Sequence, residues 1–126
     1  MRTLSKSKLI AFRQCPKRLW LEVHRPELRE VSPETKARFQ VGYQVGDIAS
    51  RIYDPEGNGA VIDFKTEGFD GAFARTGDLV ANSKQPIFEA GFKVKGALAF
   101  ADVLLPVRKN GQTAWKMVEV KSSTRV

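Results

Sequence analysis

The dipeptide Asn110-Gly111 lies between two apolar stretches and narrows the folds open to this chain more than any other feature. Asn-Gly in that setting predicts a two-residue type I′ hairpin turn, because both central positions of such a turn need a positive φ. A turn at these two positions also fixes the strand register, so that the numbers of facing residues add to 221. Asp102 is then expected opposite Glu119, with Cβ atoms about 5 Å apart.

These two facing carboxylates are expected to have a lysine and a third acid beside them. Lys121 follows Glu119 by two residues, so in a strand both side chains project from the same face. A tight turn at residues 95–96 pairs residues whose numbers add to 191, which places Glu89 opposite Asp102. Three acids are therefore expected side by side on one face of three neighbouring strands.

Carboxylates grouped in this way predict a divalent-metal site for phosphodiester hydrolysis. Mg²⁺ and Mn²⁺ prefer hard oxygen ligands, and a bound metal ion lowers the pKa of its water and acts as a Lewis acid. We expect Asp102 and Glu119 to bind the metal, with the backbone carbonyl of Val120 as a third ligand and Glu89 as a further candidate. Lys121 is the expected catalytic lysine, which would orient the water or stabilise the developing charge.

Two other classes of function stay open at this point. A Glu-x-Lys motif at a strand end is usually a surface ion pair, so the acids could form structural ion pairs with Lys93 or Lys121 in a small assembly module. The chain could also be a catalytically inactive nucleic-acid-binding or scaffolding domain with a nuclease-like fold. Cleavage that Asp102→Ala abolishes while binding stays intact separates the catalytic alternative from the binding domain, and destabilisation of the fold by Asp102→Ala favours the ion-pair alternative.

The charge of the chain points to a polyanionic partner. The net charge is +7, and residues 1–25 hold seven basic side chains and one acid. Such a basic segment favours nucleic acid as the partner, although a solvated basic helix face would have the same composition. The residues expected to contact phosphates lie within this segment: Lys6, Lys8, Arg13, Lys17 and Arg18.

Composition indicates a single globular domain. The 126 residues are 42% hydrophobic and 28% charged, which excludes a disordered chain. No apolar run approaches the 18 residues of a membrane span, and the N-terminus lacks the apolar segment of a signal peptide. Cys15 is the single cysteine, so an internal disulfide is excluded and a cytoplasmic location is expected. We treat residues 1–126 as one domain with a basic helical segment at residues 1–30.

Local signals predict helices followed by strands. Ser5 or Ser7 caps a first short helix, Pro16 starts a second that should bring Trp20 into the core, and Ser32 precedes a long one. The fold class is therefore α/β or α+β, with N-terminal helices followed by a three-stranded antiparallel meander. The expected longer helices cover residues 33–53 and 69–82, a short strand covers residues 61–64, and the meander strands cover residues 87–94, 97–105 and 113–122.

The order of these residues resembles a known nuclease superfamily. Asp102, followed after sixteen residues by Glu119-Val120-Lys121, resembles the signature of the PD-(D/E)XK nucleases. Residues 4–10 and 15–20 resemble the start of its RecB-like branch, which includes CRISPR-associated RecB-type exonucleases. The resemblance spans residues 5–123. It implies a restriction-endonuclease-like core, a mixed sheet flanked by helices, and Mg²⁺- or Mn²⁺-dependent cleavage of nucleic acid, with DNA the expected substrate rather than RNA.

The chain departs from that family at three places. Many RecB-type members carry a histidine metal ligand four residues after a helical glycine, where this chain has Gly46 after Gly42. Some members hold an iron–sulfur cluster with one N-terminal and three C-terminal cysteines, of which only Cys15 is present, so we expect no cluster from this chain alone. The family core also continues beyond Lys121. We therefore expect an N-terminal part of a longer domain, whose exposed sheet edge would favour a homo-oligomer.

Overall fold

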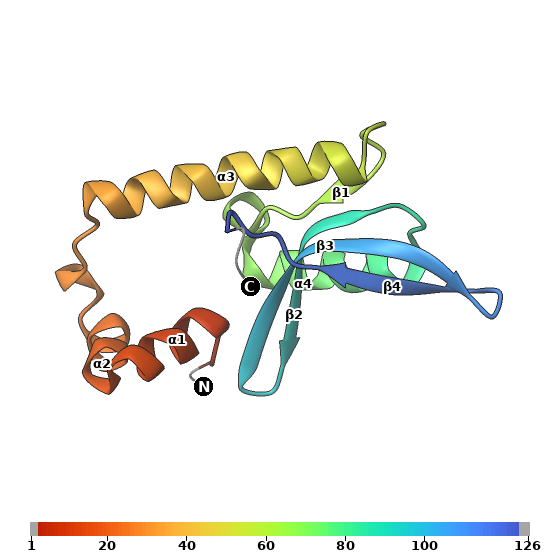
Figure 1. Cartoon of the computed structure of the whole chain (residues 1–126). Coiled ribbons are helices and arrows are strands. Elements are labelled where there is room, and N and C mark those ends of the chain that lie inside the picture. The colour runs from red at the N-terminus through yellow and green to blue at the C-terminus, as the bar shows by residue number, and fades with distance from the viewer. Residues whose placement is uncertain (1–2, 124–126) are drawn as a thin grey trace.

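A computed structural model describes residues 3–123 and shows an α+β fold (Figure 1). Helix α4 lies behind the sheet, and the long helix α3 crosses above it. The helices are α1 (Lys6–Gln14), α2 (Pro16–His24), the 3-10 helix η1 (Pro26–Leu28), α3 (Pro33–Tyr53) and α4 (Phe64–Asn82). The strands are β1 (Ala60–Val61), β2 (Ile87–Val94), β3 (Ala97–Lys109) and β4 (Gln112–Val118).

The strand registers predicted from the two turns are confirmed. Pro106 faces Trp115 across the β3–β4 hairpin, and the other pairs of that ladder also add to 221. Asn110 has φ 51° and Gly111 has φ 76°, which are the two positive values that a type I′ turn requires. The β2–β3 ladder follows the second predicted register, with pairs such as Phe88 with Val103 that add to 191.

The predicted three-stranded antiparallel meander is formed by β2, β3 and β4, but the sheet contains a fourth strand that this prediction left out. The sheet has four strands in the order β1-β2-β3-β4, and β1 runs parallel to β2, with Ala60 facing Ile87. The short strand expected at residues 61–64 begins at Ala60 and ends at Val61, because Asp63 caps α4 by accepting from the Lys65 backbone. The last strand ends at Val118, four residues before its expected end.

Helix α4 covers one face of the sheet and builds the core. The Trp115 indole donates a hydrogen bond to the Val80 carbonyl at 3.0 Å, and the backbone N–H of Gly91 donates to the buried Thr76 hydroxyl at 3.0 Å. Gly68, with φ 70°, kinks the helix. The helix predicted for residues 69–82 corresponds to the part of α4 that follows this kink. The buried apolar cluster consists of Ile62, Ala72, Ile87, Ala90, Ala101 and Leu104.

The N-terminal helices form where their caps predict, and α1 is tied to the sheet. Ser5 caps α1, and Leu4 extends the sheet by one bridge, donating to the Gly96 carbonyl and accepting from Leu98, both at 2.9 Å. The expectation that Trp20 lies in the core is wrong. Its side chain is 55% exposed and stacks on His24, with ring centroids 4.8 Å apart.

Helix α3 touches the rest of the described chain through a narrow stripe. Its N-cap Ser32 accepts from the Thr35 backbone, as the Ser-Pro start predicts, and Ala49 is its one buried residue. The apolar side chains on either side of that stripe stay exposed, including Ile48 and Ile52. Among residues 3–123, no helix has the length and apolar character needed to cross a membrane.

Candidate functional site

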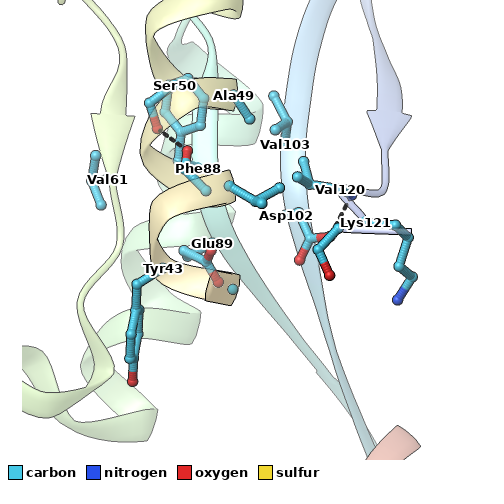
Figure 2. A pocket seen from close by; sticks show the side chains of 14 residues that line it. Tyr43, Ala49, Ser50, Val61, Phe88, Glu89, Asp102, Val103, Val120 and Lys121 are labelled. Atoms are coloured by element: carbon cyan, nitrogen blue, oxygen red, sulfur yellow. Dashed lines mark hydrogen bonds between the residues drawn. The ribbon is translucent and has the colours of Figure 1, made fainter. Parts of the chain in front are cut away.

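A pocket of about 340 Å³ lies between α3 and the strands β2 and β3. Two acids line it, Glu89 from β2 and Asp102 from β3, and Figure 2 shows both side chains. Lys121, from the segment after β4, lies on the far side of Asp102, and its amine points away from the two acids. The structure therefore brings together two of the three predicted acids.

Glu89 reaches this pocket through an unusual backbone conformation. Its φ is 58°, in the left-handed region that residues with a Cβ rarely occupy. The ladder is interrupted at Glu89 alone: Phe88 still pairs with Val103 and Ala90 still pairs with Ala101. The register therefore continues on both sides of Glu89. Strained backbone of this kind is concentrated at functional sites, where the surrounding structure holds it in place.

The environment of the two acids disfavours a second negative charge. Burial raises the pKa of Glu89, and the neighbouring charge of Asp102 raises this pKa further. One oxygen of Asp102 accepts a hydrogen bond from the Val120 backbone N–H at 2.7 Å. This bond holds the segment after β4 against β3 and fixes the orientation of the Asp102 carboxylate.

Glu119 does not join the carboxylates in the pocket. Strand β4 ends at Val118, one position before the pair that would have placed Glu119 opposite Asp102. The Glu119 carboxylate instead accepts from the Lys121 amine at 2.8 Å and also from the Lys6 amine. Hydrogen bonds from Lys121 and Lys6 lower the pKa of Glu119 to about 2. The predicted metal ligand is thus half-exposed and paired with two lysines.

Lys121 and Val120 lie at the pocket as predicted, with altered partners. Both residues line the pocket. The hydrogen bond to Glu119 raises the pKa of Lys121, so this side chain stays a cation at neutral pH. The ion pair that one alternative expected between Lys93 and the candidate acids is not formed. The Lys93 amine instead lies 3.7 Å from the carboxylate of Asp70. The ion pair between Lys121 and Glu119 is formed.

Helix α3 contributes residues that the strand motif did not reveal. Tyr43 and Gly46 line the pocket, and the Ser50 hydroxyl donates to the Gly46 carbonyl at 3.1 Å (Figure 2). A Cβ added at Gly46 would have no neighbour within 4 Å, so there is room for a side chain. The spacing of Gly42 and Gly46 was the one sequence signal that pointed to this position.

The basic residues predicted to contact phosphates differ in their availability. Lys6 is paired with Glu119, and the Lys8 amine donates to the Thr3 carbonyl at 2.6 Å. Arg18 donates to Glu22 at 2.9 Å. Arg13 and Lys17 are exposed and form no ion pair with residues 3–123.

The donor set fits a hard divalent cation in part. Mg²⁺ is commonly held by one or two carboxylates together with substrate phosphates and water, and Glu89 and Asp102 supply two carboxylates. Over residues 3–123, no three Asp, Glu, His or Cys side chains are grouped closely enough to hold a metal ion. Cys15 is exposed and unpaired. No protein-family model, curated protein or solved structure matches this chain.

Proposed function

We propose that this chain carries the site of a metal-dependent nuclease, which hydrolyses phosphodiester bonds of nucleic acid, with DNA the expected substrate. The observation that supports this most is the pair of facing carboxylates, Glu89 and Asp102, in a pocket beneath α3. A partly buried acid on a strained backbone, with its pKa raised by burial and by an acidic neighbour, favours a cation as ligand. The excess of basic residues supplies attraction for a phosphate backbone.

Each residue of the site has a distinct part in this proposal. Glu89 and Asp102 would hold Mg²⁺ or Mn²⁺, with the Val120 carbonyl nearby, and the Val120 N–H keeps Asp102 oriented. The metal would supply Lewis-acid chemistry and an activated water. Lys121 supplies a fixed positive charge near the phosphate. Glu119 positions Lys121 through their 2.8 Å ion pair, which replaces the metal-binding role expected from the sequence.

A second candidate is a nucleic-acid-binding or scaffolding domain that does not cleave its ligand. It is favoured by the ion pairs of Glu119, which leave two acids in the pocket, and by Gly46, which offers no side-chain ligand there. Under this alternative the basic residues bind nucleic acid, and the Glu89–Asp102 pair stays metal-free.

Calorimetric titration with Mn²⁺ distinguishes the two candidates. The nuclease proposal expects binding that Asp102→Asn and Glu89→Gln each weaken at least tenfold, and Mn²⁺-dependent cleavage of labelled DNA that both variants abolish. Asp70→Asn is the matched control, since the Asp70 carboxylate lies on α4 and is 95% exposed. DNA binding without Mn²⁺ binding or cleavage by the wild-type chain would establish the second candidate instead.

A further inference from the structure

A second hollow opens beside the carboxylate pocket, between α1 and the strands β3 and β4. This groove has a volume of about 780 Å³. The groove and the pocket are lined in common by Asp102, Val120 and Lys121. An extended ligand lying in the groove would therefore end at the facing carboxylates.

Two phenylalanine rings form part of the groove surface. Phe69 from α4 is 58% exposed and Phe100 from β3 is 40% exposed, and their ring centroids are 6.4 Å apart. Phe100 is held by Phe64, at 4.4 Å between ring centroids, and by Phe73, at 6.2 Å. The rings are thus fixed by packing while part of their surface faces solvent. Such fixed, exposed aromatic surface is suited to stacking on a flat ligand.

The charged residues of the groove suit a phosphate backbone. Lys6 and Lys8 line it from α1, and Lys121 lines the end that it shares with the pocket. The acids facing these cations are Glu119, which pairs with Lys6 and Lys121, and Asp102. Lysines beside exposed aromatic rings are the combination with which proteins bind single-stranded nucleic acid, through phosphate contacts and base stacking.

We infer that this groove binds an unpaired stretch of nucleic acid, with a base stacked on Phe69 and Phe100 and phosphates along Lys6 and Lys8. Bases inside a duplex are stacked on their neighbours and offer no free face, so the two rings favour a single strand over a duplex. The strand's course toward Glu89 and Asp102 rests on the proposed nuclease function. Binding in the groove does not, because it needs neither metal nor hydrolysis.

The test is fluorescence anisotropy of a labelled single strand of about twelve nucleotides, and of its duplex, with the 126-residue chain in EDTA. The single strand is expected to bind at least tenfold more tightly than the duplex. Phe69→Leu and Phe100→Leu keep the apolar bulk and remove the ring, so each should weaken single-strand binding about tenfold. Phe92→Leu is the control, because Phe92 on β2 is 42% exposed and does not line the groove.

Equal affinity for strand and duplex, or an equal loss with Phe92→Leu, would overturn the inference. So would a result in which the two groove variants alter self-association in sedimentation and leave strand binding unchanged, since the groove would then be an interface between copies of the chain. A 5-iodouracil strand crosslinked to the wild-type chain checks the site without any variant. Crosslinks to peptides that contain Phe69 or Phe100 support the groove, and crosslinks confined to α2 or α3 contradict it.

The same samples separate this inference from the proposed nuclease function. Ring-dependent strand binding in EDTA, together with no cleavage when Mn²⁺ is added, supports the groove and refutes the nuclease. Mn²⁺-dependent cleavage, together with strand binding that neither Phe69→Leu nor Phe100→Leu weakens, supports the nuclease and refutes the groove.

Discussion

The candidate site depends on one residue, Glu89, whose backbone departs from the strand that carries it. With the usual strand geometry its side chain would alternate with those of Phe88 and Ala90, both of which are buried. Glu89 has a left-handed φ of 58°, and its carboxyl interacts with the charge of Asp102, at the opposite position of β3. Placing two acids together opposes folding whenever both are ionised, so this arrangement should leave a trace in the pH dependence of stability.

Glu89→Gln should remove the Glu89 contribution to the pH dependence of stability. Because the folded chain raises the pKa of Glu89 above its ordinary 4.5, the folded state holds this proton more tightly than the unfolded state. The Glu89 contribution to stability is therefore full below pH 4.5 and is lost as pH rises through the raised pKa. We therefore expect the melting temperature of Glu89→Gln, relative to that of wild type, to increase as the pH rises from 4.5 to 8.

Thermal melts across that pH range check this expectation, with Glu30→Gln as control because Glu30 is an exposed residue in the loop before α3. If the curves of Glu89→Gln and wild type run parallel, the Glu89 carboxyl is not strained against Asp102. Adding Mn²⁺ at pH 8 should raise the wild-type melting temperature more than that of Glu89→Gln if the pair binds the ion.

At the scale of strands and helices, the features set by local chemistry were predictable, and those set by distant contacts were not. Asn110-Gly111 determines its own turn and hence the β3–β4 register, and Ser5 and Ser32 cap the helices that follow them. The fate of Glu119 was not predictable. The Val120 N–H is taken by Asp102, which ends β4 early, and Lys6 binds Glu119 from 113 residues away in the sequence.

The kink in α4 gives a prediction at the same scale. Gly68 has φ 70° and ψ 167°, a region that is nearly exclusive to glycine, so Gly68→Ala should cost about 1–3 kcal/mol. Gly77 in the same helix has no positive φ and no neighbour within 4 Å of an added Cβ, so Gly77→Ala should stabilise by about 0.5–1 kcal/mol. Urea denaturation measures both. Stabilisation by both substitutions would mean that α4 is one continuous helix.

For the molecule as a whole, the question is where a nucleic-acid backbone would run. The basic helices α1 and α2 lie at one end, and the tip of the β3–β4 hairpin lies at the other (Figure 1). Arg13 and Lys17 are exposed on the two helices and have no carboxylate partner among residues 3–123, whereas Arg18 is paired with Glu22. Unpaired cations gain most from phosphates, since no existing ion pair has to break.

The salt dependence of strand binding tests this placement. For a single strand, the slope of log affinity against log salt changes by about 0.7 for each phosphate contact, so replacing Arg13 and Lys17 together by alanine should reduce its magnitude by about 1.4. Arg108 and Lys109, exposed near the hairpin tip, give a control with the same loss of net charge. Because a long-range effect of net charge would act equally in both double variants, equal slopes would show that Arg13 and Lys17 do not contact the strand's phosphates. A smaller slope in the helix variant alone would place the backbone along the helices that lead to the groove.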